Sequence, residues 1–169
     1  KAVVRNLPPK PKGRTVVIAV GKAAIPMAKA VEDNWDGPLE GLVIAPHGYT
    51  HNLQRLRLVY GSHPVPDKTS LAAAEQALAL AATLGPDDLL IALISGGASA
   101  LMSKPVPGIS IEEKFGLVKA VLRCGANIGE LNSVRKQISA VKGGRLARAA
   151  GRARIWTLAL SDVPGDDPA

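Results

Sequence analysis

The chain has 169 residues, a formal net charge of +7 and one cysteine; this length suffices for one compact domain, and one cysteine excludes a disulfide framework or a cysteine-based metal site. The positive charge suits an anionic small molecule, but no run of five or more Lys/Arg residues supports nucleic-acid binding. Neither a signal peptide nor an uninterrupted apolar stretch of about 18 residues is visible, so we expect a cytoplasmic protein without a membrane span.

The first half of the chain alternates short apolar runs with helical patterns. Residues 1–13, with three prolines, predict a lead-in segment or linker before a domain over 14–169. Pro26 falls in the first turn of one predicted helix, where proline is tolerated, and Asp67 can cap the next. That second helix is apolar nearly all round, which predicts deep packing or a face for a partner, so a homodimer is one interpretation. Strands are predicted over 15–20, 41–45 and 56–60, and helices over 23–31 and 67–84.

The second half contains an apolar run from residue 90 that ends in Ser95-Gly96-Gly97-Ala98-Ser99. The run is typical of a buried strand, and the two glycines allow a sharp turn into a helix. Several N–H groups and the helix dipole would then point at one anion. Ser110 and Glu113 have capping-box spacing, and the helix they begin should bury one apolar face. That face holds Ile111, Phe115, Val118 and Leu122; further helices are predicted over 130–142 and 145–150, and a last strand over 155–160.

This β-α-β-β-α-β-α-α-β alternation predicts an α/β fold. We expect a Rossmann-like, mainly parallel sheet with helices on both faces. In such a sheet the ligand lies outside the carboxyl ends of the strands. The loops that would share this rim are Gly21-Lys22, Pro46-His47-Gly48, Gly61-Ser62-His63, Ser95-Gly96-Gly97 and Ser161-Asp162.

Lys22 and the turn of residues 95–99 are the first candidate site residues. An ammonium beside a phosphate would offset charge that develops during phosphoryl transfer. The alternative is that Lys22 is a solvated lysine at a helix start. Ser95, Gly96, Gly97, Ala98 and Ser99 could cradle a phosphate, or could form a tight turn that lets a strand pack closely on a helix.

A polar stripe on the predicted helix over 130–142 is the second candidate. Asn132, Arg135, Ser139 and Lys142 recur at spacings of three, four and three, which places them on one face. The stripe is either a solvated face or a clamp for a carboxylate or phosphate.

Asp162 and His63 complete the candidates. Asp162 follows the last strand, where a carboxylate can hold Mg²⁺ or accept a hydroxyl proton, or can cap a turn. His63 is either a structural loop residue or a neighbour of the substrate. His47, His51 and His63 are too scattered in the sequence to indicate a metal site.

Five motifs, in order and spanning nearly the whole chain, resemble the class II glycerate kinases, the glycerate 2-kinase family, whose members are often mislabelled hydroxypyruvate reductases. One such motif would be weak, whereas five in series are specific. They are V-G-K-A-A-x-x-M-A at 20–28, G-S-H-P-V-P-D at 61–67, I-S-G-G-A-S-A-L-M at 94–102, L-N-S-V-R-K-Q-I-S-A-V-K-G-G-R-L-A at 131–147 and S-D-V-P-G-D at 161–166.

The resemblance implies an ATP-dependent kinase that phosphorylates D-glycerate to 2-phosphoglycerate with Mg²⁺. It also implies a Rossmann-like N-terminal domain and a smaller C-terminal domain that closes over the substrate. The family also supplies an essential arginine from the later part of its chain, and we expect both that part and the second domain to be absent here. We therefore expect an incomplete piece of a two-domain enzyme that is inactive by itself.

The same resemblance implies roles for individual residues. Lys22 is similar to the lysine that contacts the transferring phosphate, and Asp162 to the acidic residue that assists the hydroxyl or the metal. Residues 95–99 are similar to the phosphate-binding turn. Arg135 and Lys142, together with Asn132 and His63, are similar to substrate contacts. A non-catalytic sugar-phosphate or nucleotide-binding module of Rossmann type would use the same turns, and this alternative stays open.

Overall fold

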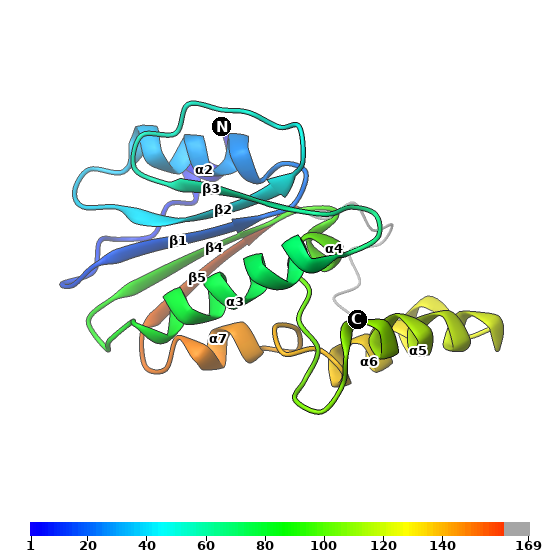
Figure 1. Ribbon diagram of the computed structural model, residues 1–169. Helices are drawn as coiled ribbons and strands as arrows, with labels where there is room; N and C mark the ends of the chain where they lie inside the picture. The colour runs from blue at the N-terminus through cyan, green and yellow to red at the C-terminus, as the bar shows by residue number, and fades with distance from the viewer. Residues whose placement is uncertain (161–169) are drawn as a thin grey trace.

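The computed structural model describes residues 1–160, and its centre is a parallel sheet (Figure 1). Within these residues the strand order is β3-β2-β1-β4-β5, and every neighbouring pair is parallel. The α/β fold predicted from the sequence is therefore confirmed. The strands are β1 (Thr15–Val20), β2 (Glu40–Pro46), β3 (Arg57–Gly61), β4 (Leu89–Ile94) and β5 (Arg154–Ala159).

Helices cover both faces of the sheet, as the alternation of elements predicts (Figure 1). One apolar cluster joins α2 to the sheet, and another joins α3 and α7 to the opposite face. All six residues of β1 are buried because this central strand is covered on both sides. The helices are α1 (Ala2–Arg5), α2 (Ala24–Asn34), α3 (Lys68–Ala82), α4 (Ala98–Leu101), α5 (Ile111–Arg123), α6 (Ile128–Gln137) and α7 (Arg145–Ala149).

Side-chain caps set the starts of α3, α5 and α6, the three longest helices that follow β3 in the chain. The predicted caps Asp67 and Ser110 both accept backbone N–H groups of their helices, α3 and α5. Asn127 does the same for α6 through a capping box that the sequence reading missed. Each cap satisfies N–H groups that have no partner within the helix. Within the described residues, every helix is too short or too polar to cross a bilayer.

Helix α3 packs on the sheet by one face only. Its small residues Ala73, Ala74, Ala77 and Ala81 are buried against the strands. Alanine side chains let the helix approach the sheet closely, which explains why an almost wholly apolar helix fits here. Deep packing, one of the two interpretations of this helix, therefore accounts for that face.

The prediction that one helix over 130–142 carries the polar stripe is wrong, because α6 ends at Gln137. The Arg145 guanidinium donates to the Lys136 carbonyl, which the helix end leaves free, and to the Ser139 carbonyl just after the helix. Ser139 is buried and forms an isolated antiparallel β-bridge with Pro105. Lys142 therefore reaches the site from a loop, not from the helix that carries Arg135.

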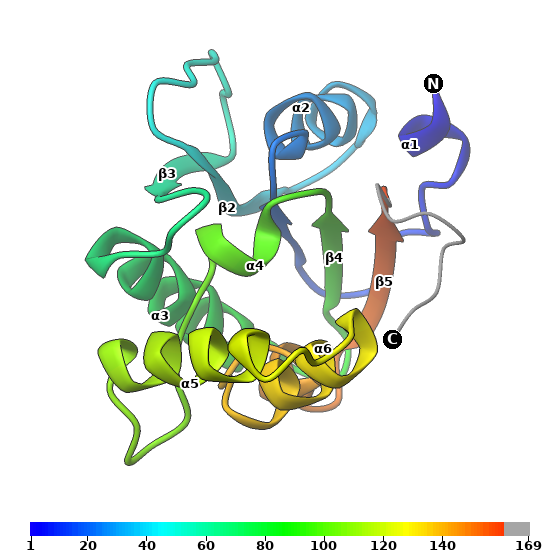
Figure 2. The same ribbon diagram turned by 90° about the vertical axis from the view of Figure 1, so that its right-hand side faces the viewer.

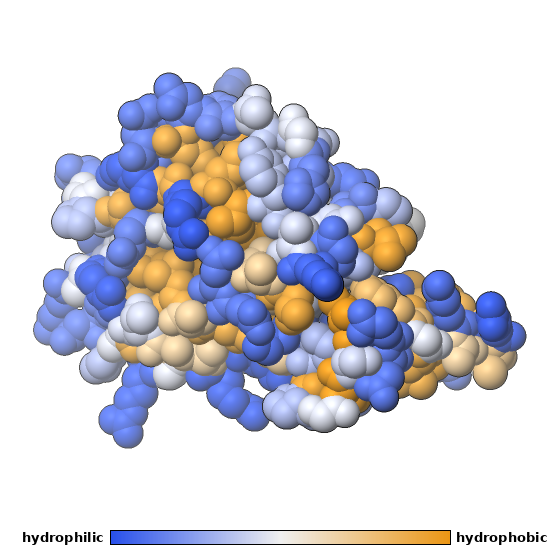
Figure 3. Space-filling view, in the orientation of Figure 1, coloured by the Kyte–Doolittle hydropathy of each residue, from blue (hydrophilic) through white to orange (hydrophobic). Residues whose placement is uncertain are grey.

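The buried face predicted for α5 is also wrong. Helices α5 and α6 pack on each other and form an arm that extends away from the sheet (Figures 1 and 2). Phe115 and Val118 are half-buried and Leu122 is 50% exposed, while the buried residue of α5 is Lys114. In the space-filling view the arm shows apolar surface interleaved with hydrophilic side chains (Figure 3).

The lead-in segment is partly structured and is tied to the sheet. Residues 2–5 form α1, and the Trp156 indole N–H on β5 donates to the Asn6 carbonyl at 2.9 Å. Val3 and Leu7 pack against the α2 side of the core. The segment thus covers part of one sheet face.

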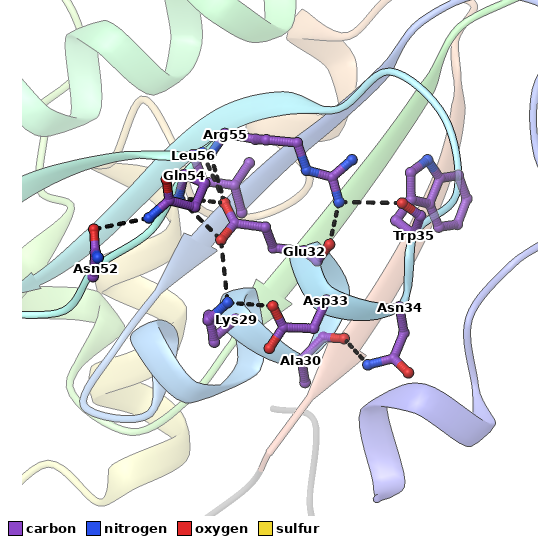
Figure 4. A network of polar contacts seen from close by, with 10 residues as sticks. All are labelled: Lys29, Ala30, Glu32, Asp33, Asn34, Trp35, Asn52, Gln54, Arg55 and Leu56. Carbon is purple, nitrogen blue, oxygen red and sulfur yellow. Dashed lines mark hydrogen bonds and ion pairs between the residues drawn. The ribbon is translucent and has the colours of Figure 1, made fainter.

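A buried carboxylate anchors the loop between β2 and β3 (Figure 4). Glu32 on α2 is 5% exposed and accepts backbone N–H groups from Gln54, Arg55 and Leu56 at 2.7–3.1 Å. Burial by itself raises the pKa of this carboxyl, but the three N–H groups and the nearby Lys29 outweigh burial and hold its pKa below the ordinary value. The carboxylate therefore serves as a fixed structural anion.

Candidate functional site

The turns after β1 and β4 lie side by side at the topological switch point of the sheet. The Lys22 N–H donates to the Gly96 carbonyl at 2.9 Å, and the Ala23 N–H donates to Ser95 Oγ at 3.0 Å. Gly21, at φ +126°, packs so closely on Ser95 that a Cβ would overlap its hydroxyl. Parallel sheets bind ligands at such a point, and the two strand–glycine junctions predicted from the sequence meet here.

Ser95 holds the two turns together. Its side chain is buried, accepts from Ala23 and lies 3.4 Å from the Val20 carbonyl. The Ser95 carbonyl in turn accepts the N–H of Ala98. Ser95 and Ala98 were both predicted to contact phosphate, but the Ser95 hydroxyl and the Ala98 N–H already have protein partners.

The rest of the predicted phosphate turn keeps donors available. Among residues 1–160, the N–H groups of Gly96, Gly97 and Ser99 donate to no protein acceptor. Helix α4 is only four residues long, so the helix dipole expected from the sequence contributes little. Any anion here would be held by the N–H groups of the turn and by nearby side chains.

Lys22 and His63 meet across Gly97. A Cβ on Gly97 would lie 2.9 Å from His63 Cδ2 and 3.5 Å from Lys22 Cγ, and the residue has φ +87°. Glycine is therefore required both for its backbone conformation and for the close approach of two side chains. Lys22 is exposed, and its ammonium is available to a ligand at the turn.

A cavity of about 430 Å³ opens beside this turn. Figure 2 looks onto the carboxyl edge of the sheet, with α4 in front of the strands and α5 and α6 below them. The apolar lining is formed by Pro64, Val65, Pro66, Ala100, Phe115 and Val118. The polar lining is formed by His63, Gly97, Ser99, Ser103, Lys114, Lys119, Arg135 and Lys142.

A smaller cavity of about 280 Å³ shares three lining residues with the first. The shared residues are Ser99, Arg135 and Lys142, and the second cavity adds Asn132. The structure thus brings together the substrate residues predicted from the sequence, although two different elements supply Arg135 and Lys142.

Lys142 links the basic lining to the turn. Its ammonium donates to Ser99 Oγ at 2.5 Å. Burial, and then the charges of Arg135 and Lys136, hold the pKa of Lys142 below the ordinary value. Each of these causes disfavours the charged form, and a bound anion would oppose them.

Lys114 is a site residue that the sequence reading missed. It is 6% exposed and donates to Ser103 Oγ at 2.9 Å. Burial, with the charges of Lys142 and Arg135, lowers its pKa to about 8. A signal was present, because Lys114 lies three residues after Ile111 and four before Val118, in line with an apolar stripe.

The lining suits an anion and not a divalent cation. Neither cavity is lined by Asp or Glu, and residues 1–160 contain no group of three or more His, Cys, Asp or Glu side chains that could hold a metal. Mg²⁺ prefers carboxylate and other oxygen ligands, so these linings do not fit it. Asp162, the residue predicted for the metal, lies outside the described residues.

Fold and site together define a parallel α/β protein with a cation-lined cavity at the carboxyl edge of its sheet. The chain belongs to the family described as Domain of unknown function (DUF4147), whose model matches residues 2–169. The resemblance to glycerate 2-kinases is confirmed by the relatives that follow.

Three known proteins illustrate the similarity. The chain is 49% identical to an Agrobacterium vitis protein provisionally named hydroxypyruvate reductase, over 99% of this chain and 38% of that protein. It is 41% identical to the glycerate 2-kinase of Pyrococcus horikoshii, again over 99% and 38%. The crystal structure of Thermotoga maritima glycerate kinase superposes with a TM-score of 0.89 at 37% identity, covering 98% of this chain and 39% of that chain. The chain thus spans about two fifths of the length of the curated relatives it matches.

Proposed function

We propose that the protein containing this chain transfers the γ-phosphoryl group of ATP to a hydroxyl of D-glycerate. The products are ADP and 2-phosphoglycerate, and the hydroxyl proton is released. The observation that carries the proposal is the cation-lined cavity beside the Gly97 turn, in a chain that is 41% identical to a glycerate 2-kinase. Both reactants are anions, and phosphoryl transfer depends mainly on positioning and charge stabilisation.

The role proposed for each residue follows from its position in the site. Lys22, exposed at the turn, would neutralise charge on the transferring phosphoryl group. The N–H groups of Gly96, Gly97 and Ser99 would bind phosphate oxygens. The proposal assigns the residues that line the two cavities to the anionic groups of the reactants; they are His63, Asn132, Arg135 and Lys142.

Mg²⁺, Asp162, the cytoplasmic location and the homodimer belong to the proposal as predictions from the sequence. The described linings do not fit Mg²⁺, so no step is assigned to it here. Inactivity of residues 1–169 alone is part of the same proposal, because the chain spans only two fifths of its relatives.

A coupled assay of the full-length protein tests the assigned roles. With ATP, Mg²⁺ and D-glycerate, we expect Lys22→Ala to lower kcat by about 100-fold, the scale of losing one charge-stabilising group in a transition state. Asp162→Asn should also lower turnover strongly. Lys68→Ala is the matched control, because Lys68 is an exposed lysine at the start of α3, outside both cavities.

Two results would contradict the proposal. If Lys22→Ala and Asp162→Asn keep turnover within a few-fold of the wild type, the assigned roles are wrong. Binding of sugar phosphates without any transfer would favour the non-catalytic Rossmann-type module.

A further inference from the structure

The cations of the larger cavity have no anionic partner among the described residues. The ion pairs found within residues 1–160 involve other side chains, such as Lys104 with Glu75 at 2.8 Å. Lys114, Arg135 and Lys142 line one cavity without an Asp or Glu in its lining. A cluster of like charges around one cavity is unfavourable unless a ligand of opposite charge binds there.

Lys114 makes the cluster hard to explain as a solvated surface. It is 6% exposed, whereas an ordinary lysine keeps its ammonium in water. Its single hydrogen-bond partner among the described residues is Ser103 Oγ, which is itself buried. An ammonium has three N–H donors, so two remain for a ligand in the cavity.

The cluster is also held in place from three separate elements. Lys114 comes from α5, Arg135 from α6 and Lys142 from the loop before α7. Ser103 orients Lys114, and Ser99 orients Lys142 at 2.5 Å. Fixed donors that converge on one space are the arrangement that binds an oxyanion.

We propose that Lys114, Arg135 and Lys142 form one subsite for an oxyanion, either the carboxylate of the hydroxy acid or a phosphate of the nucleotide, with Lys114 as its buried donor. This inference deepens the proposed function and rests on it. The same cavity is also lined by the apolar side chains of Pro64, Val65 and Phe115, so the charged end of the ligand would contact the three cations.

The affinity of the subsite for its oxyanion should depend on pH. A bound oxyanion favours the charged form of Lys114, so affinity falls as this ammonium deprotonates above pH 8. The other charged or titratable groups on the lining are His63, Lys119, Arg135 and Lys142. An arginine keeps its charge at all relevant pH values. Lys114→Arg therefore removes the part of the pH dependence of affinity that comes from Lys114 and leaves the part that comes from Lys142.

Steady-state kinetics of the full-length protein test the inference. At pH 7, Lys114→Met should raise the KM of one reactant by about 10- to 100-fold, the usual effect of losing a charged hydrogen bond, and change kcat by less than a few-fold. The reactant that responds, D-glycerate or ATP, identifies the source of the oxyanion. The wild-type KM for that reactant should rise about tenfold from pH 7 to pH 9, and Lys114→Arg should flatten this rise.

Lys68→Met, which removes an exposed lysine from α3, is the control and should leave both KM values unchanged. The inference is overturned if Lys114→Met changes neither KM by more than twofold. It is equally overturned if the pH dependence of Lys114→Arg matches the wild type. Thermal unfolding of each variant verifies that it is folded.

Failure of the subsite and failure of the kinase proposal give different results. If the full-length protein transfers no phosphoryl group, calorimetric titration with inorganic pyrophosphate and with D-glycerate still tests the subsite. Weaker binding of either probe to Lys114→Met supports the subsite although the kinase proposal fails. Equal binding by wild type and variant overturns the subsite.

Discussion

Replacing Lys114 by methionine should stabilise the ligand-free protein. Methionine has a similar length and can fill the same buried space without an ammonium. Burial and the two neighbouring cations lower the pKa of Lys114 from 10.5 to about 8 in the fold, and at about 1.4 kcal/mol per pKa unit the charged lysine costs about 3 kcal/mol. The charges of Lys142 and Arg135, which line the same cavity, contribute to this cost.

The sign of the pH dependence follows from the direction of the shift. Below pH 8 both folded and unfolded chains carry the charge, so the cost is present in full. Between pH 8 and 10.5 the unfolded chain binds more protons than the folded one, and stability therefore rises with pH. The gain from Lys114→Met should accordingly be about 3 kcal/mol at pH 7 and roughly half of that at pH 9.5.

Urea unfolding of the ligand-free protein at these two pH values measures the effect. Lys114→Arg is the matched control, because it keeps the charge and should give no gain. No gain for Lys114→Met at pH 7 would refute the reasoning. An equal gain at both pH values would attribute the effect to packing instead of charge. A stabilised but poorly binding variant is the expected pattern for a residue kept for function.

Two further substitutions test the fold and the turn. Glu32→Gln should lower the free energy of unfolding by about 2–3 kcal/mol, because the buried carboxylate accepts N–H groups of residues 54–56; urea unfolding measures this, and Asp33→Asn on the exposed side of α2 should cost well under 1 kcal/mol. An equal loss for both variants would contradict this role for Glu32. Gly97→Ala should lower kcat/KM at least tenfold, because its Cβ would meet His63 Cδ2 at 2.9 Å in a backbone at φ +87°; unchanged steady-state kinetics would show that the turn tolerates a side chain.

The sheet could be predicted because its strands are apolar runs that end at glycine or polar residues. The first strand was predicted over 15–20 and is observed there. Parallel strands share one carboxyl edge, so the placement of both glycine turns on that edge followed from the order of elements. The residue types within short stretches of sequence are therefore enough to predict the strands and the edge of the sheet at which the turns lie.

The missed features depend on contacts between distant segments. Helix α6 ends at Gln137, where Arg145 donates to the Lys136 carbonyl, and no local sequence pattern predicts that contact. Lys114 is buried at 6% exposure, and its ammonium donates to Ser103, which lies outside α5 in the loop before it. The lysine within an apolar stripe was visible, but its burial is a consequence of the tertiary fold.

The most direct test of the central claim is the product formed by the full-length protein from ATP and D-glycerate. We predict ADP formation that requires D-glycerate, and a product identified by phosphorus NMR as 2-phosphoglycerate. NAD(P)H-dependent reduction of hydroxypyruvate, with no transfer of phosphate to D-glycerate, would contradict the account.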